Sequence, residues 1–301
     1  HTWSRLSEAE RQVLTGLTVF RGGFTLAAAR AVAGADLETL LAMLNRLLVR
    51  RQAEGRFVLH ELIRQYAERR AEERELERAR TAHSRYFTDL LSDLTADIKG
   101  AAVQQALATV QADSANFEAA WYHAVERADL DAIEGASPTL DEYFYYKGQL
   151  DAARRAFGAG LETLTPLAQA PGPAQARAAR IRARLQVNVA QKEFWTGDFQ
   201  AALDRLEEAG RTLAEHGTAT DLARARLVQG NGLVRYAAYA EARPLFEQVL
   251  TTAAEEGDLY LEGAAHNGLA NVLSYLEGDV RRAEEHYSLS LEAHTHVGNL
   301  E

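Results

Sequence analysis

A fourfold internal repeat in the second half of the chain restricts its fold more than any other feature. Each copy has a glycine or alanine, an apolar residue two positions later, an alanine three positions after that, and a large apolar residue four further on. The copies begin at Gly148, Gly197, Ala237 and Gly278. Their alanines, Ala153, Ala202, Ala242 and Ala283, recur at intervals of 49, 40 and 41 residues. Because one helical hairpin cannot bury its own apolar stripe, such copies must stack on one another. The pattern predicts a mostly α-helical chain that ends in an α-solenoid with a concave face.

The pattern resembles the tetratricopeptide repeat. In that family a glycine forms the turn, a small residue lies where two helices touch, and a large apolar residue follows one turn later. The basic unit is about 34 residues, so an interval of about 40 implies longer helices. A non-repetitive helical bundle is the alternative.

In a solenoid of this kind, the first helix of each pair lines the groove. The residues expected to face the groove are Arg184, Gln191, Phe194, Trp195, Arg224, Asn231, Arg235, Asn267, Asn271 and Tyr275. Asn231 and Asn271 occupy equivalent positions in their copies. Asparagines can hydrogen-bond a peptide backbone, and arginines can bind a carboxylate. These residues therefore predict binding of a protein, peptide or small-molecule inducer, although a groove lined by merely solvated polar groups explains them equally well.

The first 75 residues have a different organisation. Ser7 and Glu10 form a capping-box pattern before a helix that we expect to end at Gly22 and Gly23. A second helix is expected from Thr25 to Gly34, a third from Leu37 to about Arg50, a hairpin turning at Glu54 and Gly55, and a last helix from His60. Three helices and a hairpin predict a winged helix-turn-helix domain.

A winged helix raises the question of DNA binding. Residues 1–75 have a net charge of +2, whereas the remaining residues have −12. The third predicted helix is dominated by leucine rather than by the arginine, lysine, asparagine and glutamine that read bases. Its polar positions include Glu38, Thr39 and Asn45, and only Arg50 and Arg51 cluster positive charge. We therefore expect this domain to pack against another protein domain and not to bind DNA.

Two segments of the winged helix resemble the STAND class of signal-transduction ATPases, in particular its NB-ARC members. Leu59-His60-Glu61-Leu62 is similar to their "MHD" segment, and residues 17–24 are similar to an "LSVFxGGF" block. The resemblance implies that His60 contacts the β-phosphate of bound ADP and locks a closed state. The alternative is a structural histidine that caps the last helix. Residues 113–121 are similar to a segment often found just after the winged helix in bacterial STAND proteins.

The chain lacks the nucleotide-binding part of such a protein. No Gly-x-x-x-x-Gly-Lys-Ser/Thr loop occurs, and the three lysines, Lys99, Lys147 and Lys192, follow no glycine-rich loop. We therefore expect no cofactor in this chain and ADP or ATP in a longer protein. The expected partners are an upstream NB-ARC ATPase module of the same protein and an inducer in the repeat groove, with possible oligomerisation on activation.

Other patterns restrict the function further. The chain has no cysteine, which fits a reducing compartment, and no apolar run of about 20 residues that could cross a bilayer. A cytoplasmic protein without membrane contact is expected. His60 to Arg64 nearly matches a zinc-protease motif, but arginine stands at the second ligand position. His286, His294 and His296 lack a carboxylate at a suitable spacing, so no metal site is expected. No Gly-x-Ser-x-Gly motif and no Ser/His/Asp spacing stands out, so no enzyme is expected.

The expected domains are a winged helix over 1–75, a helical junction with the first repeat over 76–170, and tetratricopeptide-like repeats over 171–301. The leading hypothesis is a regulatory and sensor fragment of a STAND-type ATPase or transcriptional regulator. The alternatives are a winged-helix DNA-binding regulator with a repeat sensor arm, and a protein-interaction scaffold without a switch.

Overall fold

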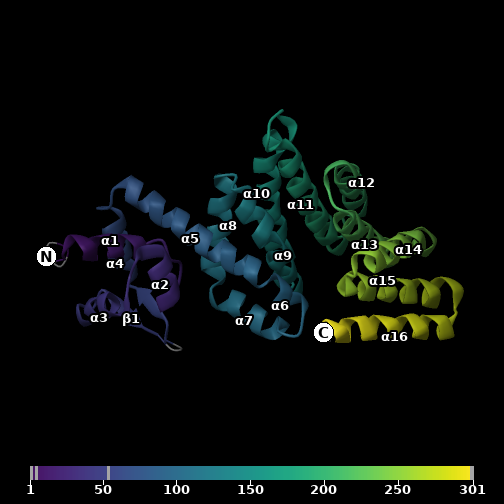
Figure 1. The fold of residues 1–301 in the computed structure, drawn as a ribbon, viewed down its shortest axis with the longest axis horizontal. Coiled ribbons are helices and arrows are strands. Elements are labelled where there is room, and N and C mark those ends of the chain that lie inside the picture. Colours follow the sequence, from purple (N-terminus) through teal and green to yellow (C-terminus); the bar gives the residue numbers. More distant parts are fainter. Residues whose placement is uncertain (1–2, 4–5, 53–54, 299–301) are drawn as a thin grey trace. The chain divides into compact units, whose positions relative to one another are not determined.

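The computed structural model describes residue 3, residues 6–52 and residues 55–298 of the 301-residue chain (Figure 1). The described part is mostly helical, with one two-stranded antiparallel sheet near its start. The chain forms two compact units. The first comprises residues 1–93 and 108–136, and the second comprises residues 94–107 and 137–301. No described helix is both long enough and apolar enough to cross a bilayer.

The first unit begins with the predicted helices and hairpin. The elements are α1 (Glu8–Leu17), α2 (Leu26–Ala33), α3 (Leu37–Asn45), β1 (Val49–Arg51), β2 (Phe57–Leu59) and α4 (Glu61–Glu68). Ser7 Oγ accepts from the Glu10 backbone N–H at 3.2 Å, while the Glu10 carboxylate accepts from the Ser7 N–H at 2.8 Å. The predicted capping box is therefore confirmed. β1 and β2 pair with Val49 opposite Leu59, so the predicted hairpin is confirmed too.

Two predicted helix ends are wrong. α1 ends at Leu17 rather than at Gly22 and Gly23. α3 ends at Asn45 rather than near Arg50, because Leu47 has a left-handed φ of 59° and the chain then enters β1. Because a leucine rarely adopts this conformation, the residue type did not indicate a turn at this position. Glu54, predicted in the hairpin turn, lies outside the described residues.

The rest of the first unit packs around the winged helix. It comprises α5 (Glu73–Asp93), α8 (Ser114–Glu126), and parts of α7 (Val103–Ala112) and α9 (Leu130–Tyr146). Its core contains the wholly buried rings of Phe24, Phe87, Phe117 and Trp121. These rings come from the winged helix, α5 and α8, so the predicted junction helices bury the same core as the winged helix. The two compact units therefore do not coincide with the predicted domain segments 1–75, 76–170 and 171–301. That division into segments stays a prediction.

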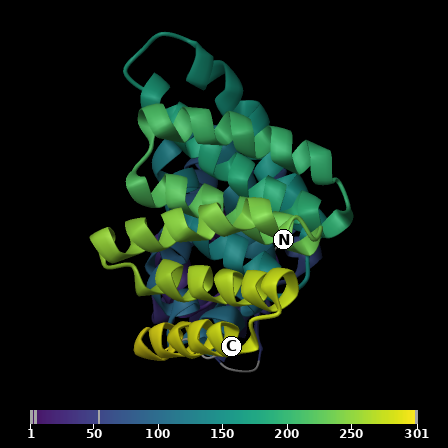
Figure 2. The same cartoon turned by 90° about the vertical axis from the view of Figure 1, so that its right-hand side faces the viewer.

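The second unit is a series of helical hairpins, the last of which are stacked in Figure 2. α9 is followed by α10 (Leu150–Gln169), α11 (Gln175–Thr196) by α12 (Phe199–His216), and α13 (Ala219–Arg235) by α14 (Tyr239–Glu256). The final hairpin joins α15 (Leu259–Val272) and a π-helical segment (Leu273–Glu277) to α16 (Val280–His296), and α6 (Thr95–Lys99) completes the unit. The four repeated alanines, Ala153, Ala202, Ala242 and Ala283, are at most 2% exposed. The predicted helical-hairpin repeat is thus confirmed.

The turns within the hairpins share one geometry. Gly148, Gly197, Ala237 and Gly278 all have left-handed φ values, between 61° and 96°. After each of the first three, the next backbone N–H donates to the carbonyl five residues earlier at 2.9 Å, as in a Schellman motif. In the fourth turn, Asp279 N–H instead donates to the carbonyl of Leu273, six residues earlier. The π-helical segment therefore holds one extra residue, which accounts for an interval of 41 rather than 40.

The same turn also joins α8 to α9. Ala128 has a φ of 51°, and the Asp129 N–H donates to the carbonyl of Ala124 at 2.9 Å. This hairpin was not predicted, because Ile133 stands where the other copies have alanine.

Candidate functional site

His60 lies between β2 and α4 and caps the helix. Its Nδ1 accepts from the Leu62 backbone N–H at 3.2 Å. Because Nδ1 is the acceptor, the neutral ring carries its proton on Nε2. The capping role considered for this histidine is therefore present in the structure, and it leaves a donor on the opposite side of the ring.

His60 also lines a cavity of about 390 Å³ whose wall includes three arginines, Arg21, Arg50 and Arg64. The carboxylate in the lining is that of Glu61, which accepts two hydrogen bonds from Arg64 at 2.6 and 2.8 Å. Hydrogen bonds from Arg64 and Gln65 lower the pKa of Glu61 to about 2, so it is ionised at neutral pH. Glu68 also pairs with Arg64 at 2.7 Å and with Arg21 at 3.9 Å. Three guanidinium groups against two carboxylates leave a net charge of +1 around the cavity, which suits an anion.

Asn116 of α8 and Asp113, the residue just before α8, bind the segments beside this cavity. Asn116 Oδ1 accepts from the Arg21 backbone N–H at 2.7 Å, and its Nδ2 donates to the carbonyl of Gly23 at 2.9 Å. Asp113 accepts two hydrogen bonds from Arg56, at 2.9 and 2.5 Å. The sequence analysis assigned no role to either residue, although both belong to the 113–121 segment that it singled out. α8 thus fixes the loop that contributes Arg21.

A buried histidine completes this arrangement. The His83 Nε2 lies 3.2 Å from Asn116 Oδ1, which already accepts from Arg21. Because an amide oxygen only accepts, His83 must donate, with Nε2 protonated. Burial lowers the pKa of His83 to about 4, so the ring is neutral at pH 7.

Two leucines of α3 are exposed beside the polar Glu38 and Asn45. Leu37 and Leu41 are each 48% exposed, and Leu47, just after the helix, is 79% exposed. Leu47 also lines an apolar depression of about 390 Å³ with Trp3, Leu62 and Tyr66. Exposed apolar surface of this kind is typical of a protein contact rather than of a helix that reads DNA.

The predicted groove residues fall into distinct environments. Arg184 makes two hydrogen bonds to Asp221, at 2.6 and 3.0 Å, and the Arg235 guanidinium lies 4.0 Å from the ring centre of Trp195. Asn267 accepts from Asn271 at 3.1 Å, and Tyr275 stacks on Tyr239 with ring centres 5.6 Å apart. Gln191, Arg224 and Asn231 of the predicted set line one common cavity.

Phe194 does not line the groove. It is 3% exposed and belongs to the core between the second and third hairpins. A Cβ built on Gly232 would lie 2.3 Å from its ring, so the ring packs directly on the α13 backbone. The expectation for Phe194 is therefore wrong, because the glycine opposite it gives the ring a place in the core.

The cavity shared by Gln191, Arg224 and Asn231 lies within the second unit and measures about 200 Å³. Its charged lining consists of Lys99, Asp141, Glu142, Arg224 and Asp258. Lys192 lies wholly buried behind Asp141, with its Nζ 2.6 Å from an Asp141 oxygen. Lys99 and Lys192 were singled out in the sequence only as lysines that follow no glycine-rich loop. No role was predicted for Asp141, Glu142 or Asp258.

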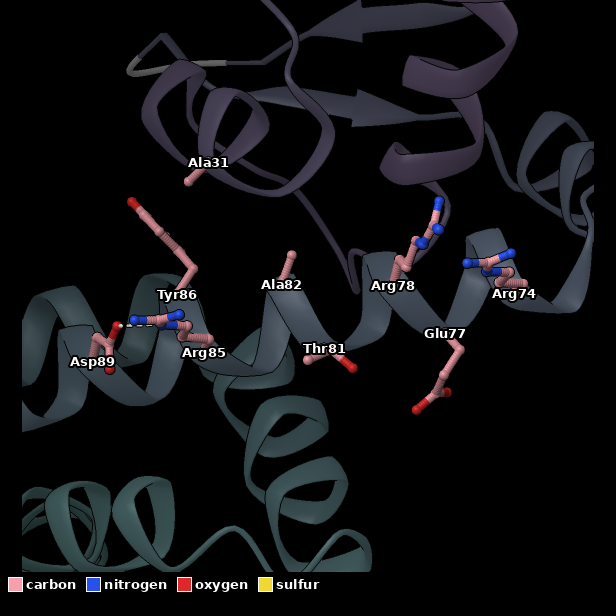
Figure 3. A pocket seen from close by; sticks show the side chains of 9 residues that line it. All are labelled: Ala31, Arg74, Glu77, Arg78, Thr81, Ala82, Arg85, Tyr86 and Asp89. Carbon is pink, nitrogen blue, oxygen red and sulfur yellow. Dashed lines mark ion pairs between the residues drawn. The ribbon is translucent and has the colours of Figure 1, made fainter.

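A broader depression of about 750 Å³ runs along α5 beside Ala31 of α2 (Figure 3). Arg78 and Tyr86 extend on the side of α5 on which Ala31 lies in this view, whereas Glu77 and Thr81 point away from that side. Arg85 and Asp89 form an ion pair at 3.7 Å on the exposed side of the helix. These side chains do not converge on one point, so the depression is a poor candidate for a specific site. No cluster of three potential metal ligands occurs in the described part of the chain.

Comparison with known proteins yields one solved structure of similar fold. It is a signal transduction ATPase with numerous domains (STAND) protein with a tetratricopeptide repeat sensor, from Pyrococcus horikoshii. The two share 11% sequence identity with a TM-score of 0.54. The match covers 98% of this chain and 46% of that protein. The likeness is one of fold.

No protein-family model matches this sequence, and no curated protein matches it. The chain therefore shares its fold with part of a STAND protein at low sequence identity. It spans about half the length of that protein, and no catalytic domain is evident in the part that the structure describes.

Proposed function

We propose that this chain is the regulatory and sensor part of a STAND-type switch protein. The observation that carries the proposal is the fold likeness, over 98% of the chain, to a STAND protein with a tetratricopeptide repeat sensor. The winged helix would control the nucleotide state of an ATPase module outside this chain. The helical hairpins would bind an inducer, and binding would favour the open state by interacting with it more strongly.

The cavity at His60 supports the assignment to the winged helix. Its proton-bearing Nε2 and three surrounding arginines offer donors and positive charge to a phosphate group. Because His60 also caps α4, one side chain would link the start of that helix to the nucleotide. We therefore assign to His60 the contact with the phosphate of ADP, with Arg21 and Arg50 as neighbouring positive groups.

The test is nucleotide exchange in a full-length protein that contains this chain. His60→Ala should raise the rate of ADP release by about tenfold or more, since a hydrogen bond to a charged group is worth about 1.5–3 kcal/mol. The measurement is the release of a fluorescent ADP analogue by stopped flow.

Because His60 caps α4, His60→Ala also removes that cap. His60→Ser keeps a capping acceptor but is too short to reach a phosphate, so it should release ADP as fast as His60→Ala. His216→Ala, on α12, is the matched control and should release ADP at the wild-type rate. Wild-type release from His60→Ser would overturn the phosphate role and leave capping as the function of His60.

A further inference from the structure

The polar cavity of the second unit is lined by side chains from several helices and does not lie between two helices alone. Its lining comes from α6, α9, α11, α13 and α15. Gly298, which follows α16, packs against Ala101, which follows α6. A Cβ on Gly298 would lie 2.5 Å from Ala101. This contact brings α6 back to the last hairpin, and the Lys99 ammonium lies 5.5 Å from the ring centre of Tyr260 on α15. The hairpins and α6 therefore surround the cavity from several sides.

Two adjacent carboxylates of α9 differ in their partners. Asp141 accepts from Lys192 at 2.6 Å and from Arg224 at 2.8 Å, so its charge is compensated within the protein. Glu142 is only 8% exposed, and among the described residues it accepts a single hydrogen bond, from the Tyr260 hydroxyl at 3.4 Å. That distance exceeds the usual range for an O–H···O bond, about 2.5–3.0 Å. Glu142 is therefore a buried carboxyl short of donors.

The electrostatics agree with this difference. Burial raises the pKa of Glu142, because the surrounding positive groups do not offset its loss of hydration. A buried acceptor without adequate donors is costly, and such groups in native proteins call for an explanation. A cationic ligand group in the cavity would supply the missing donors.

Arg224 offers the complementary charge. A guanidinium has five N–H donors, and among the described residues Arg224 uses its Nη2 for Asp141. Its side chain is 29% exposed, and it lines the same cavity as Glu142. Arg224 can therefore bind a ligand carboxylate while it keeps its bond to Asp141.

The net charge restricts the ligand further. The positive groups of the site are Lys99, Lys192 and Arg224, and its negative groups are Asp141, Glu142 and Asp258. The charges of opposite sign cancel, so the site as a whole is neutral. A ligand with a net charge would bring an uncompensated charge into a largely enclosed space, which is costly. The cavity of about 200 Å³ holds a body of amino-acid size, and Leu227, Val228 and Leu261 form an apolar part of its wall.

We propose that this cavity binds a small zwitterionic metabolite of the amino-acid type, with its ammonium group on Glu142 and its carboxylate on Arg224. A short aliphatic body would lie against Leu227, Val228 and Leu261. This inference rests on the sensor function proposed above, because only in a sensor would the bound metabolite act as a signal. The metabolite would then be the inducer.

The test is direct binding to the whole chain by isothermal titration calorimetry. The probes are L-valine, L-leucine, 4-aminobutyrate and 5-aminovalerate, which place the two charges at different separations. At least one should bind saturably with a Kd below about 1 mM, a weak affinity equivalent to about 4.1 kcal/mol. The probes 4-methylpentanoate and 3-methylbutylamine each lack one charge of leucine, and myo-inositol is uncharged. Each should bind at least tenfold more weakly than the best zwitterion.

Variants locate the site. Glu142→Gln keeps the shape but removes the charge, and it should weaken zwitterion binding at least tenfold. Glu207→Gln, on the exposed face of α12, is the matched control and should bind as the wild type does. Circular dichroism checks that each variant folds. If Glu142→Gln does not fold, the ligand series on the wild-type chain decides the question.

The proposal is overturned if no zwitterion binds, if a singly charged probe or the polyol binds as tightly, or if a folded Glu142→Gln keeps full affinity. Any of these outcomes leaves the nucleotide-exchange test at His60 untouched, because that test uses neither this cavity nor its ligand. Conversely, unchanged nucleotide exchange in the His60 variants would remove the switch but not the ligand site.

Discussion

At the scale of single residues, His83 makes the first compact unit sensitive to acid. Its folded-state pKa of about 4 lies below the ordinary value of 6.5, so below pH 6.5 the unfolded chain binds more protons than the folded one. The stability of the unit should therefore fall as pH is lowered from about 6.5 to about 4. The full effect is about 3 kcal/mol, since one pKa unit corresponds to about 1.36 kcal/mol. Urea unfolding followed by the fluorescence of Trp121, buried in the same unit, measures it.

The control for this prediction is His83→Gln. Glutamine can still donate to Asn116 Oδ1 but does not titrate, so the variant should lose the His83 part of the pH dependence. Burial also lowers the pKa of His123, in the same unit, so a shallower dependence of the same sign should persist. A variant whose stability falls as steeply as the wild type's would show that His83 does not contribute.

Ala237 is the exception among the four predicted hairpin turns. It has a φ of 61°, whereas glycine occupies the other three equivalent positions. A left-handed conformation costs a non-glycine residue about 1–2 kcal/mol. Ala237→Gly removes this strain but adds about 0.4–1 kcal/mol of unfolded-state entropy. We expect a net stabilisation of about 0.5–1 kcal/mol, measured by chemical denaturation.

The matched change is Ala254→Gly, at an exposed position within the helical range of α14. Glycine there should destabilise the protein by up to about 1 kcal/mol, because it has a low helix propensity. Loss of stability in both variants would contradict the strain argument.

At the scale of elements, the hairpins pack through contacts between glycine and phenylalanine. Phe246 of α14 is wholly buried, and a Cβ added to Gly268 of α15 would lie 2.4 Å from its ring. A Cβ on Gly230 of α13 would lie 2.8 Å from the same ring. The ring is therefore packed closely against the backbones of two other helices. Gly268→Ala should destabilise the repeats by about 1–3 kcal/mol through overpacking, which outweighs the gain of up to about 1 kcal/mol in helix propensity.

Gly210→Ala is the matched control for this substitution. Gly210 lies within α12, and a Cβ added there would have no heavy atom within 4 Å beyond its own helix and chain neighbours. Only helix propensity then acts, so the protein should gain up to about 1 kcal/mol. Thermal unfolding of the two variants should give shifts of opposite sign, and shifts of the same sign would refute the packing argument.

The elements themselves were largely predictable, because helices and turns depend on neighbouring residues. The Ser7 and Glu10 capping box, the Thr25 cap and the repeated glycine turns all form where their patterns indicate. Two of the errors lie where a residue adopts a conformation that its type disfavours. Leu47, with its left-handed φ, follows an α3 that ends earlier than predicted. Ala128 also has a left-handed φ and forms a hairpin turn that an alanine does not indicate.

At the scale of the whole molecule, the candidate sites depend on contacts between distant parts of the chain. Arg224 meets Asp141 across 83 positions, and Asn116 meets Arg21 across 95. Arg224, which was expected to face the repeat groove, lines a polar cavity. No local pattern distinguishes Asp141 and Glu142, which line the same cavity, from other acidic residues. Only the folded second unit shows that Asp141 is compensated while Glu142 is not.

The sequence by itself determined the helical hairpins, their turns and the winged helix, because each depends on periodicity and on caps within a few residues. It also excluded a P-loop from this chain. The tertiary structure alone decided which polar residues meet. The closure of the second unit on α6 gathers six charges around one cavity, and α8 holds the loop beside His60. Such sites depend on how helices stack, and stacking is determined by the shapes of buried side chains rather than by spacing along the chain.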